Sequence, residues 1–125
     1  MARILIAEDE RDIRELITFT LRFDGHEVIA TSNGREAVEI TLREKPDLVL
    51  LDVRMPYMTG YEACKRIKEE ESISHIPVVF LSAKGQEAEV KAGLEVGAVE
   101  YIVKPFSPDQ LMERVRAILS QFGSQ

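Results

Sequence analysis

Residues 48–52 read LVLLD, a run of four apolar residues that ends in an aspartate. Apolar side chains on both faces of so short a segment are typical of a buried strand in a parallel sheet. Comparable runs lie on either side of it, at residues 4–7, 28–30, 78–81 and 99–103. The sequence therefore predicts five strands, and the acid that ends the middle one is a first candidate for function.

Amphipathic segments separate these five runs. Apolar residues follow helical spacing at positions 13, 16, 17 and 21, and again at 111, 115, 118 and 119. The second of these helices is preceded by Ser107-Pro108-Asp109-Gln110, which supplies an N-cap, a proline at the first position and a capping-box glutamine. A fourth helix, around residues 86–96, is interrupted by Gly93, and we predict that it is the least stable. Five strand–helix repeats indicate an open, doubly wound α/β fold.

The bulk composition bounds the class of protein. A chain of 125 residues with 45% hydrophobic and 30% charged residues has the size and make-up of one globular domain. We expect that domain to span residues 1–122, with a frayed tail at 123–125. The net charge of −6 and the dispersed basic residues argue against direct nucleic-acid binding. The longest apolar runs are too short to cross a membrane, and Cys64 is the only cysteine, so we expect a cytoplasmic location.

The chemistry is expected where the predicted strands end, because open α/β sheets bind ligands outside the carboxyl ends of their strands. The first strand is followed by Glu8 and Asp9, the third by Asp52, the fourth by Ser82 and the fifth by Lys104. Three carboxylates in one crevice repel one another and need a positive partner, which a divalent cation such as Mg²⁺ provides. A cation, a lysine and a carboxylate nucleophile together are suited to phosphoryl chemistry.

Each of these residues alone has a simpler explanation. An aspartate after a strand often caps the next helix, Ser82 could do the same, and Lys104 could be a solvated loop charge. Taken singly, Ser82 and Lys104 favour the structural explanation. The functional interpretation is preferred because the acids, the hydroxyl and the lysine occur together at strand ends.

The order of these motifs resembles the receiver domain of bacterial two-component response regulators, such as the chemotaxis response regulators. The motifs are Glu8-Asp9, the segment LLDVRMP at residues 50–56 with Gly60 after it, Ser82-Ala83, and Lys104-Pro105-Phe106. The resemblance extends from residue 3 to about residue 119. It implies a flavodoxin-like, doubly wound five-stranded parallel sheet, in strand order 2-1-3-4-5, flanked by five helices.

The resemblance also implies the roles of the site residues. Asp52 is the expected phosphoacceptor, and Lys104 the expected partner of the phosphoryl group. Asp9, Glu8, Asp52 and the backbone carbonyl of Arg54 are the expected protein ligands of Mg²⁺, with Mn²⁺ as an alternative ion. Such a domain is a regulator that catalyses only its own phosphorylation and dephosphorylation.

Switching is expected to involve two further residues. The resemblance implies that Ser82 moves toward the phosphoryl group and that Tyr101 then turns inward. It also implies a cis peptide bond between Lys104 and Pro105. The surface formed by the fourth helix, the fifth strand and the fifth helix is expected to change shape between the two states.

The expected partners are a sensor histidine kinase or phosphotransfer protein, and a downstream protein or covalently attached output domain. A homodimer through the fourth-helix, fifth-strand and fifth-helix surface is a further expectation. The sequence leaves open whether the chain acts alone or precedes a DNA-binding domain, and it does not identify the kinase, the signal or the output.

Two long side chains flank the site in sequence, Arg54 two residues after the phosphoacceptor and Lys84 two residues after Ser82. If they hinder the attacking water, self-dephosphorylation is slow; the alternative is that both are solvated surface charges.

Three enzyme or cofactor classes and one interaction class compete with this interpretation. A haloacid-dehalogenase-type phosphatase needs a second aspartate where this chain has Arg54. A flavodoxin needs a phosphate-binding loop where residues 8–12 read EDERD, and a P-loop enzyme needs a G-x-x-x-x-G-K motif that is absent. A degenerate receiver that acts only as an interaction module is disfavoured, because the complete set of site residues is present.

Overall fold

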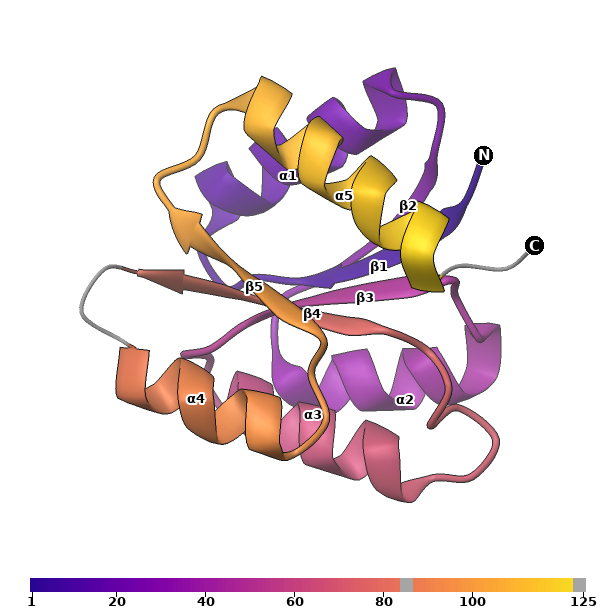
Figure 1. Ribbon diagram of the computed structural model, residues 1–125, viewed down its shortest axis with the longest axis vertical. Coiled ribbons are helices and arrows are strands. Elements are labelled where there is room, and N and C mark those ends of the chain that lie inside the picture. The colour runs from indigo at the N-terminus through magenta and orange to yellow at the C-terminus, as the bar shows by residue number, and fades with distance from the viewer. Residues whose placement is uncertain (84–86, 123–125) are drawn as a thin grey trace.

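Five parallel strands form one sheet in the order β2-β1-β3-β4-β5 (Figure 1). The computed structural model describes residues 1–83 and 87–122 of the chain. The strands are β1 (Arg3–Ala7), β2 (Glu27–Thr31), β3 (Leu48–Asp52), β4 (Val78–Ala83) and β5 (Glu100–Lys104). The predicted fold class and strand order are confirmed.

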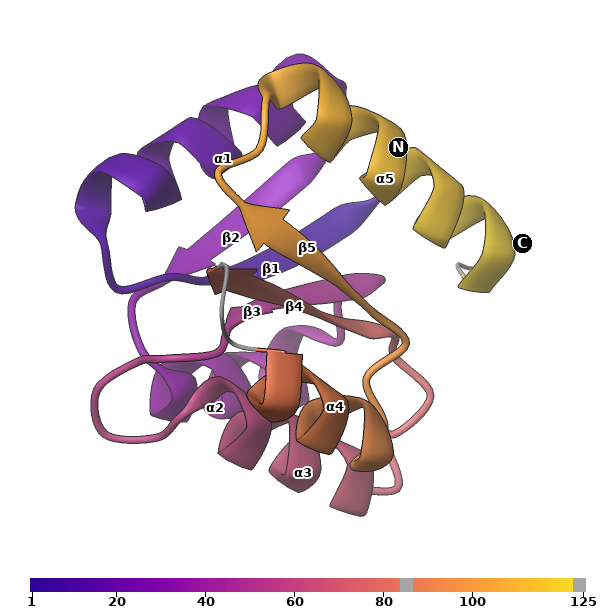
Figure 2. The ribbon, with the colours of Figure 1, turned by 60° about the vertical axis from the view of Figure 1, so that its left-hand side comes forward.

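Helices cover both faces of this sheet. They are α1 (Arg11–Phe23), α2 (Gly34–Glu44), α3 (Gly60–Glu69), α4 (Glu87–Glu95) and α5 (Pro108–Phe122). Figure 2 shows α1 and α5 on one face and α2, α3 and α4 on the other. The central strands are thereby enclosed on both sides, as expected for a doubly wound sheet.

The sheet divides the hydrophobic core into two clusters. Leu48 and Leu50 pack with α1 and α5, while Val49 and Leu51 pack with α2 and α3. Every residue of β3 is buried. This alternation explains why both faces of the LVLLD run are apolar.

Capping boxes stand at the starts of α5 and α3. Gln110 N donates to Ser107 Oγ at 3.1 Å, and Ser107 N donates to Gln110 Oε1 at 2.9 Å, so the predicted capping box before α5 is confirmed. A second capping box joins Thr59 and Glu62 at the start of α3. These caps fix where α3 and α5 begin relative to the strands that precede them.

The glycine inside α4 is required by packing. A Cβ on Gly93 would lie 1.9 Å from Cε2 of Phe80, a fully buried side chain of β4. The helix therefore approaches the sheet through a residue without a side chain. The sequence predicts a helix around residues 86–96, and the structure describes it from Glu87 to Glu95; residue 86 lies outside the described residues.

Strand boundaries are the main difference from the prediction. Most strands extend into flanking polar residues such as Glu27, Asp52 and Lys104, because these pair in register with their neighbours. Among residues 1–83 and 87–122, no helix is both long and apolar enough to span a bilayer.

Candidate functional site

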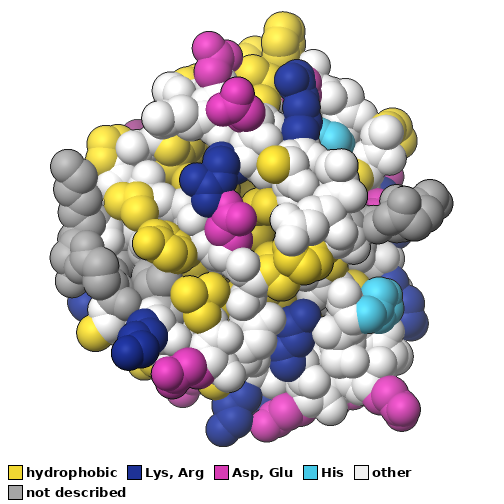
Figure 3. Space-filling model, viewed as in Figure 1, with side chains coloured by type: hydrophobic (Ala, Val, Ile, Leu, Met, Phe, Trp, Pro, Cys, Tyr) yellow, Lys and Arg dark blue, Asp and Glu magenta, His cyan; other side chains and the backbone are white. Residues whose placement is uncertain are grey.

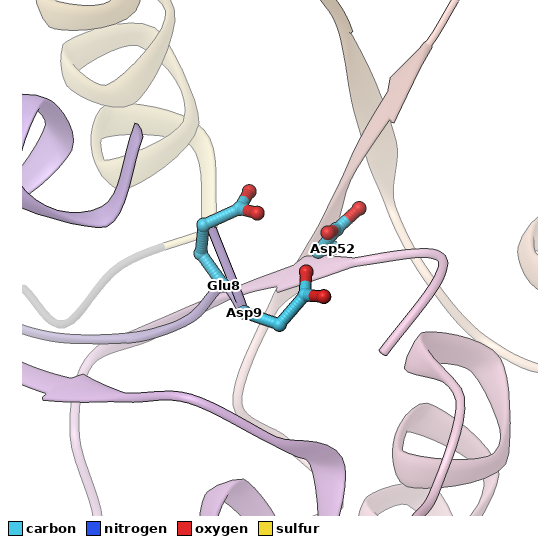
Figure 4. A group of neighbouring side chains, drawn as sticks. All are labelled: Glu8, Asp9 and Asp52. Carbon is cyan, nitrogen blue, oxygen red and sulfur yellow. The ribbon is translucent and has the colours of Figure 1, made fainter. Parts of the chain in front are cut away.

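Three carboxylates meet at the carboxyl edge of the sheet (Figure 4). Glu8 and Asp9 follow β1, and Asp52 is the last residue of β3. Because β1 and β3 are parallel neighbours, their ends lie side by side, with Ala7 paired to Leu51. A carboxylate oxygen from each of the three acids lies within 4.8 Å of the others. The predicted convergence of these acids is confirmed.

Backbone contacts fix the position of Asp52. Gly60 N donates to Val53 O at 2.8 Å, and a Cβ on Gly60 would lie 2.1 Å from Asp52 O. The start of α3 thus touches the end of β3 with no side chain between them. Arg54 N lies 3.4 Å from Asp52 Oδ1 and is a weak donor to it. Asp52 as a whole residue is 6% exposed, so its side chain is nearly enclosed but still in contact with solvent.

Lys104 provides the positive charge predicted for this site. Its Nζ lies 2.9 Å from Glu8 Oε1 and 3.4 Å from Asp52 Oδ1. Burial opposes the charged form of the lysine, but the hydrogen bond to Glu8 and the charge of Asp52 outweigh it and hold the pKa of Lys104 above its ordinary value. The lysine is therefore charged at neutral pH and bridges two of the three acids.

The environment of Asp52 raises the pKa of its carboxyl group. Burial, followed by the nearby charge of Glu8, raises the pKa of Asp52 from 3.8 to about 7, while Lys104 acts in the opposite direction. One lysine is thus not enough to compensate the acids fully. The site favours an additional positive group.

The donor set fits a divalent cation. Glu8 is fully buried, and its Oε1 is paired with Lys104 Nζ at 2.9 Å, while no other described residue donates to that oxygen. A buried oxygen with free lone pairs, beside two further carboxylates, is an oxygen-rich set of the kind that Mg²⁺ or Mn²⁺ prefers. Two oxygens that bind one Mg²⁺ directly lie at most about 4.2 Å apart. The three carboxylate oxygens lie within 4.8 Å of one another, so a bridging water or a small side-chain shift would let all three hold the ion.

The hydroxyl and the aromatic residue predicted for switching lie on adjacent strands. Ser82 in β4 is 1% exposed and pairs in register with Val103 in β5, next to Lys104. Tyr101 in β5 is 38% exposed. The Lys104–Pro105 peptide bond is cis, as expected. Lys84, the second residue of the dephosphorylation hypothesis, lies outside the described residues.

An apolar groove adjoins the site beside Lys104. It has a volume of about 140 Å³ and is lined by Ile13 and Leu16 of α1 and by Pro105 and Phe106 after β5. The groove places an apolar surface next to Lys104, the lysine that contacts Asp52.

Two residues near the site were not singled out from the sequence. Thr31 ends β2 and is buried, and its Oγ1 donates to Ile6 O at 2.8 Å. Arg14 of α1 donates from Nη1 to Glu8 O at 2.8 Å. Thr31 ends a strand as Asp52 and Lys104 do, but a threonine there carries no charge and gave no reason to choose it. Arg14 lies inside a helix, so looking only at strand ends could not find it.

Known proteins resemble this chain along nearly all of its length. The family model of the response regulator receiver domain matches residues 4–116. The phosphate regulon transcriptional regulatory protein PhoB of Pseudomonas aeruginosa is 43% identical over 120 residues, which are 96% of this chain and 52% of PhoB. The alkaline phosphatase synthesis transcriptional regulatory protein PhoP of Bacillus subtilis is 41% identical over 94% of this chain and 48% of PhoP.

The solved structures agree with the sequence relatives. The chemotaxis response regulator CheY4 of Vibrio cholerae superimposes with a TM-score of 0.90 at 32% identity, covering 95% of this chain and 99% of CheY4. The chain thus spans about half the length of the curated relatives PhoB and PhoP but nearly all of CheY4.

Proposed function

The chain belongs to the response regulator receiver domain family of two-component signalling, and from this membership we propose that it is a phosphoacceptor switch. Asp52 accepts a phosphoryl group from a sensor histidine kinase or a phosphotransfer protein. The observation that carries the proposal is the placement of a nearly enclosed Asp52 carboxylate against Lys104 and two further acids.

The proposed reaction is a transfer between two side chains. An oxygen of ionised Asp52 attacks the phosphorus of a phosphohistidine, the new O–P bond forms as the N–P bond breaks, and the imidazole leaves with the electron pair. The Lys104 ammonium, already 3.4 Å from Asp52 Oδ1, stabilises the negative charge that the phosphoryl oxygens bring. The domain is then a regulator that acts on itself rather than an enzyme for a separate substrate.

A bound Mg²⁺ would supply a second positive charge, which would stabilise the negative charge of the phosphoryl oxygens. The residues proposed to hold it are Glu8, Asp9, Asp52 and the backbone carbonyl of Arg54, and Mn²⁺ is an alternative because it prefers the same oxygen ligands. The convergence of the Glu8, Asp9 and Asp52 carboxylates and the raised pKa of Asp52 support this assignment.

The proposed phosphodonor docks beside the site on the apolar groove between α1 and the segment after β5. Ile13, Leu16, Pro105 and Phe106 line this groove, which opens next to Lys104. A helix that carries the donor histidine can bury apolar residues there while its imidazole faces Asp52.

The proposed output surface comprises α4, β5 and α5. On this face hydrophobic side chains surround basic and acidic ones near the centre (Figure 3). A groove of about 640 Å³ runs along β5 and the start of α5, and Arg114 and Glu100 form an ion pair beside it. Ser82 moving toward the phosphoryl group leaves room for Tyr101, so the two states present different shapes to a partner.

The partner at this surface is a downstream protein or a covalently attached output domain, and a homodimer through α4, β5 and α5 is one form of the active state. The relatives PhoB and PhoP are named as transcriptional regulatory proteins, and this chain spans about half of each. We propose a cytoplasmic domain, residues 1–122, that itself contacts neither nucleic acid nor membrane.

The decisive experiment is incubation with Mg²⁺ and acetyl phosphate, followed by intact mass measurement. The wild-type protein is expected to gain one phosphoryl group, and both Asp52→Ala and removal of Mg²⁺ with EDTA should abolish the gain. Asp47→Ala, which changes an aspartate at the opposite end of β3, is the control and should leave the gain unchanged. A gain that persists in Asp52→Ala contradicts the assignment, and no gain in any sample favours a degenerate receiver that works only by binding.

A further inference from the structure

The loop between β1 and α1 carries two of the three acids, but they are held very differently. Glu8 is fully buried, its N–H donates to Thr31 O at 3.1 Å, and its Oε2 accepts from Glu10 N at 3.1 Å. Asp9 is exposed. Packing therefore fixes Glu8, whereas the direction of the Asp9 carboxylate depends on how its backbone is held.

The usual device for holding such a loop is missing at this helix. The N-cap residue of α1 is Glu10, and its side chain makes no capping hydrogen bond. By contrast, α2 is capped by Asn33 and α3 by Thr59. The junction that carries the acids thus lacks the side-chain cap that fixes the starts of α2 and α3.

Arg14 replaces that cap from inside the helix. It is the fourth residue of α1, and helical side chains lean toward the N-terminus, so its guanidinium reaches back over the loop. Its Nη1 donates to Glu8 O at 2.8 Å and to Asp9 O at 3.3 Å. One cationic group therefore holds the carbonyls of both acids at once.

We propose that Arg14 is a positioning residue for the divalent cation: by holding the Glu8 and Asp9 carbonyls, it keeps the Asp9 carboxylate directed at Asp52. This inference rests on the proposed function. The geometry suits a positioning role. The Arg14 guanidinium donates to the backbone carbonyl oxygens of the loop, whereas the Glu8 and Asp52 carboxylates pair with Lys104. Arg14 thus orients the loop through its backbone carbonyls and does not compete with the cation for a carboxylate oxygen.

This role predicts an effect opposite in sign to simple electrostatics. Removing a positive charge near an acidic cluster should strengthen cation binding if charge alone matters. Loss of positioning should weaken it, by about tenfold, which is typical when a group that orients metal ligands is removed. The sign of the change in Kd for Mg²⁺ therefore separates the two explanations.

The test is calorimetric titration of the unphosphorylated chain with Mg²⁺, which requires no phosphodonor. Arg14→Ala should raise the Kd about tenfold, and Arg14→Lys, which keeps a cationic donor, should recover most of the affinity. Arg22→Ala is the matched control, because Arg22 lies on the same helix and also donates to a carbonyl, that of Val28, at 3.2 Å. It removes the same charge and should leave the Kd unchanged or slightly lower.

An Arg14→Ala protein that binds Mg²⁺ as tightly as the wild type, or more tightly, overturns the positioning role. If that variant does not fold, Arg14→Gln decides, because the shorter amide cannot reach both carbonyls and its Kd must also rise. A wild-type chain that binds no Mg²⁺ contradicts the proposed metal site itself, and the Arg14 role with it. A wild type that binds together with an unaffected Arg14→Ala contradicts only the role of Arg14.

Discussion

Replacing Asp52 with asparagine should stabilise the metal-free protein at alkaline pH. The change keeps the shape of the side chain but removes a carboxylate whose pKa is raised from 3.8 to about 7 by burial and by Glu8. Between pH 4 and pH 7 the Asp52 carboxyl is protonated in the folded protein but ionised in the unfolded chain. The free energy of unfolding of the wild type therefore falls as the pH rises from about 4 to about 7. At pH 8 the full loss is present, and asparagine avoids it.

The size of the gain follows from the pKa of Asp52. The difference between 3.8 and about 7 corresponds to about 4 kcal/mol, because each pKa unit is worth about 1.36 kcal/mol. Asparagine gives up the ion pair with Lys104, and water at the mouth of the site screens part of the penalty. We therefore expect the free energy of unfolding to rise by about 2 kcal/mol at pH 8 and to change little at pH 4.

Urea unfolding in EDTA, followed by far-UV circular dichroism at several pH values, measures this difference. Asp109→Asn, at an exposed position in the first turn of α5, is the matched control and should show no such pH-dependent gain. Adding Mg²⁺ should reverse the order, because a ligand at 100 times its Kd stabilises the wild type by about 2.7 kcal/mol and the variant lacks one ligand. A variant no more stable than the wild type at pH 8 without metal would refute the reasoning.

Three further predictions concern packing, pH and phosphoryl lifetime. Gly93→Ala should lower the free energy of unfolding by about 1–3 kcal/mol in urea titrations, because the new Cβ meets the Phe80 ring; an unchanged midpoint would show that α4 moves away freely. Burial lowers the pKa of His26, so the folded state favours the neutral ring and the free energy of unfolding falls as the pH drops below about 6.5. His26→Gln should reduce this fall between pH 7 and pH 5 in urea unfolding curves. The same fall in the wild type and the variant would contradict the prediction. Replacing Arg54 and Lys84 together with alanine should shorten the lifetime of phosphorylated protein followed by intact mass, and an unchanged lifetime would leave both as surface charges.

The fold was predictable because its signal is local and repeated. An apolar run such as residues 48–51 can be fully buried only inside a sheet covered on both faces, and five such runs with helices between them leave few arrangements. The ends of the strands were less predictable, because polar residues such as Glu27 join the ladder once a neighbour offers its backbone.

The site was predictable to the extent that topology alone places it. Asp52 and Lys104 meet because parallel strands end at one edge, and a sequence shows which residues end strands. Arg14 could not be found in this way. It lies inside a helical pattern, where an arginine is ordinarily a solvated charge, and its contacts depend on the three-dimensional path of the loop that it holds.

The contact between Gly60 and Asp52 has a consequence for redesign of the domain. Since a Cβ at residue 60 would overlap Asp52 O, the start of α3 and the end of β3 cannot be separated by a side chain without moving one of them. A library that alters partner choice can vary the exposed positions of α1, such as Phe19 and Phe23, without touching this contact. Position 60 offers no such freedom, because even the smallest added side chain there displaces Asp52, the proposed phosphoacceptor.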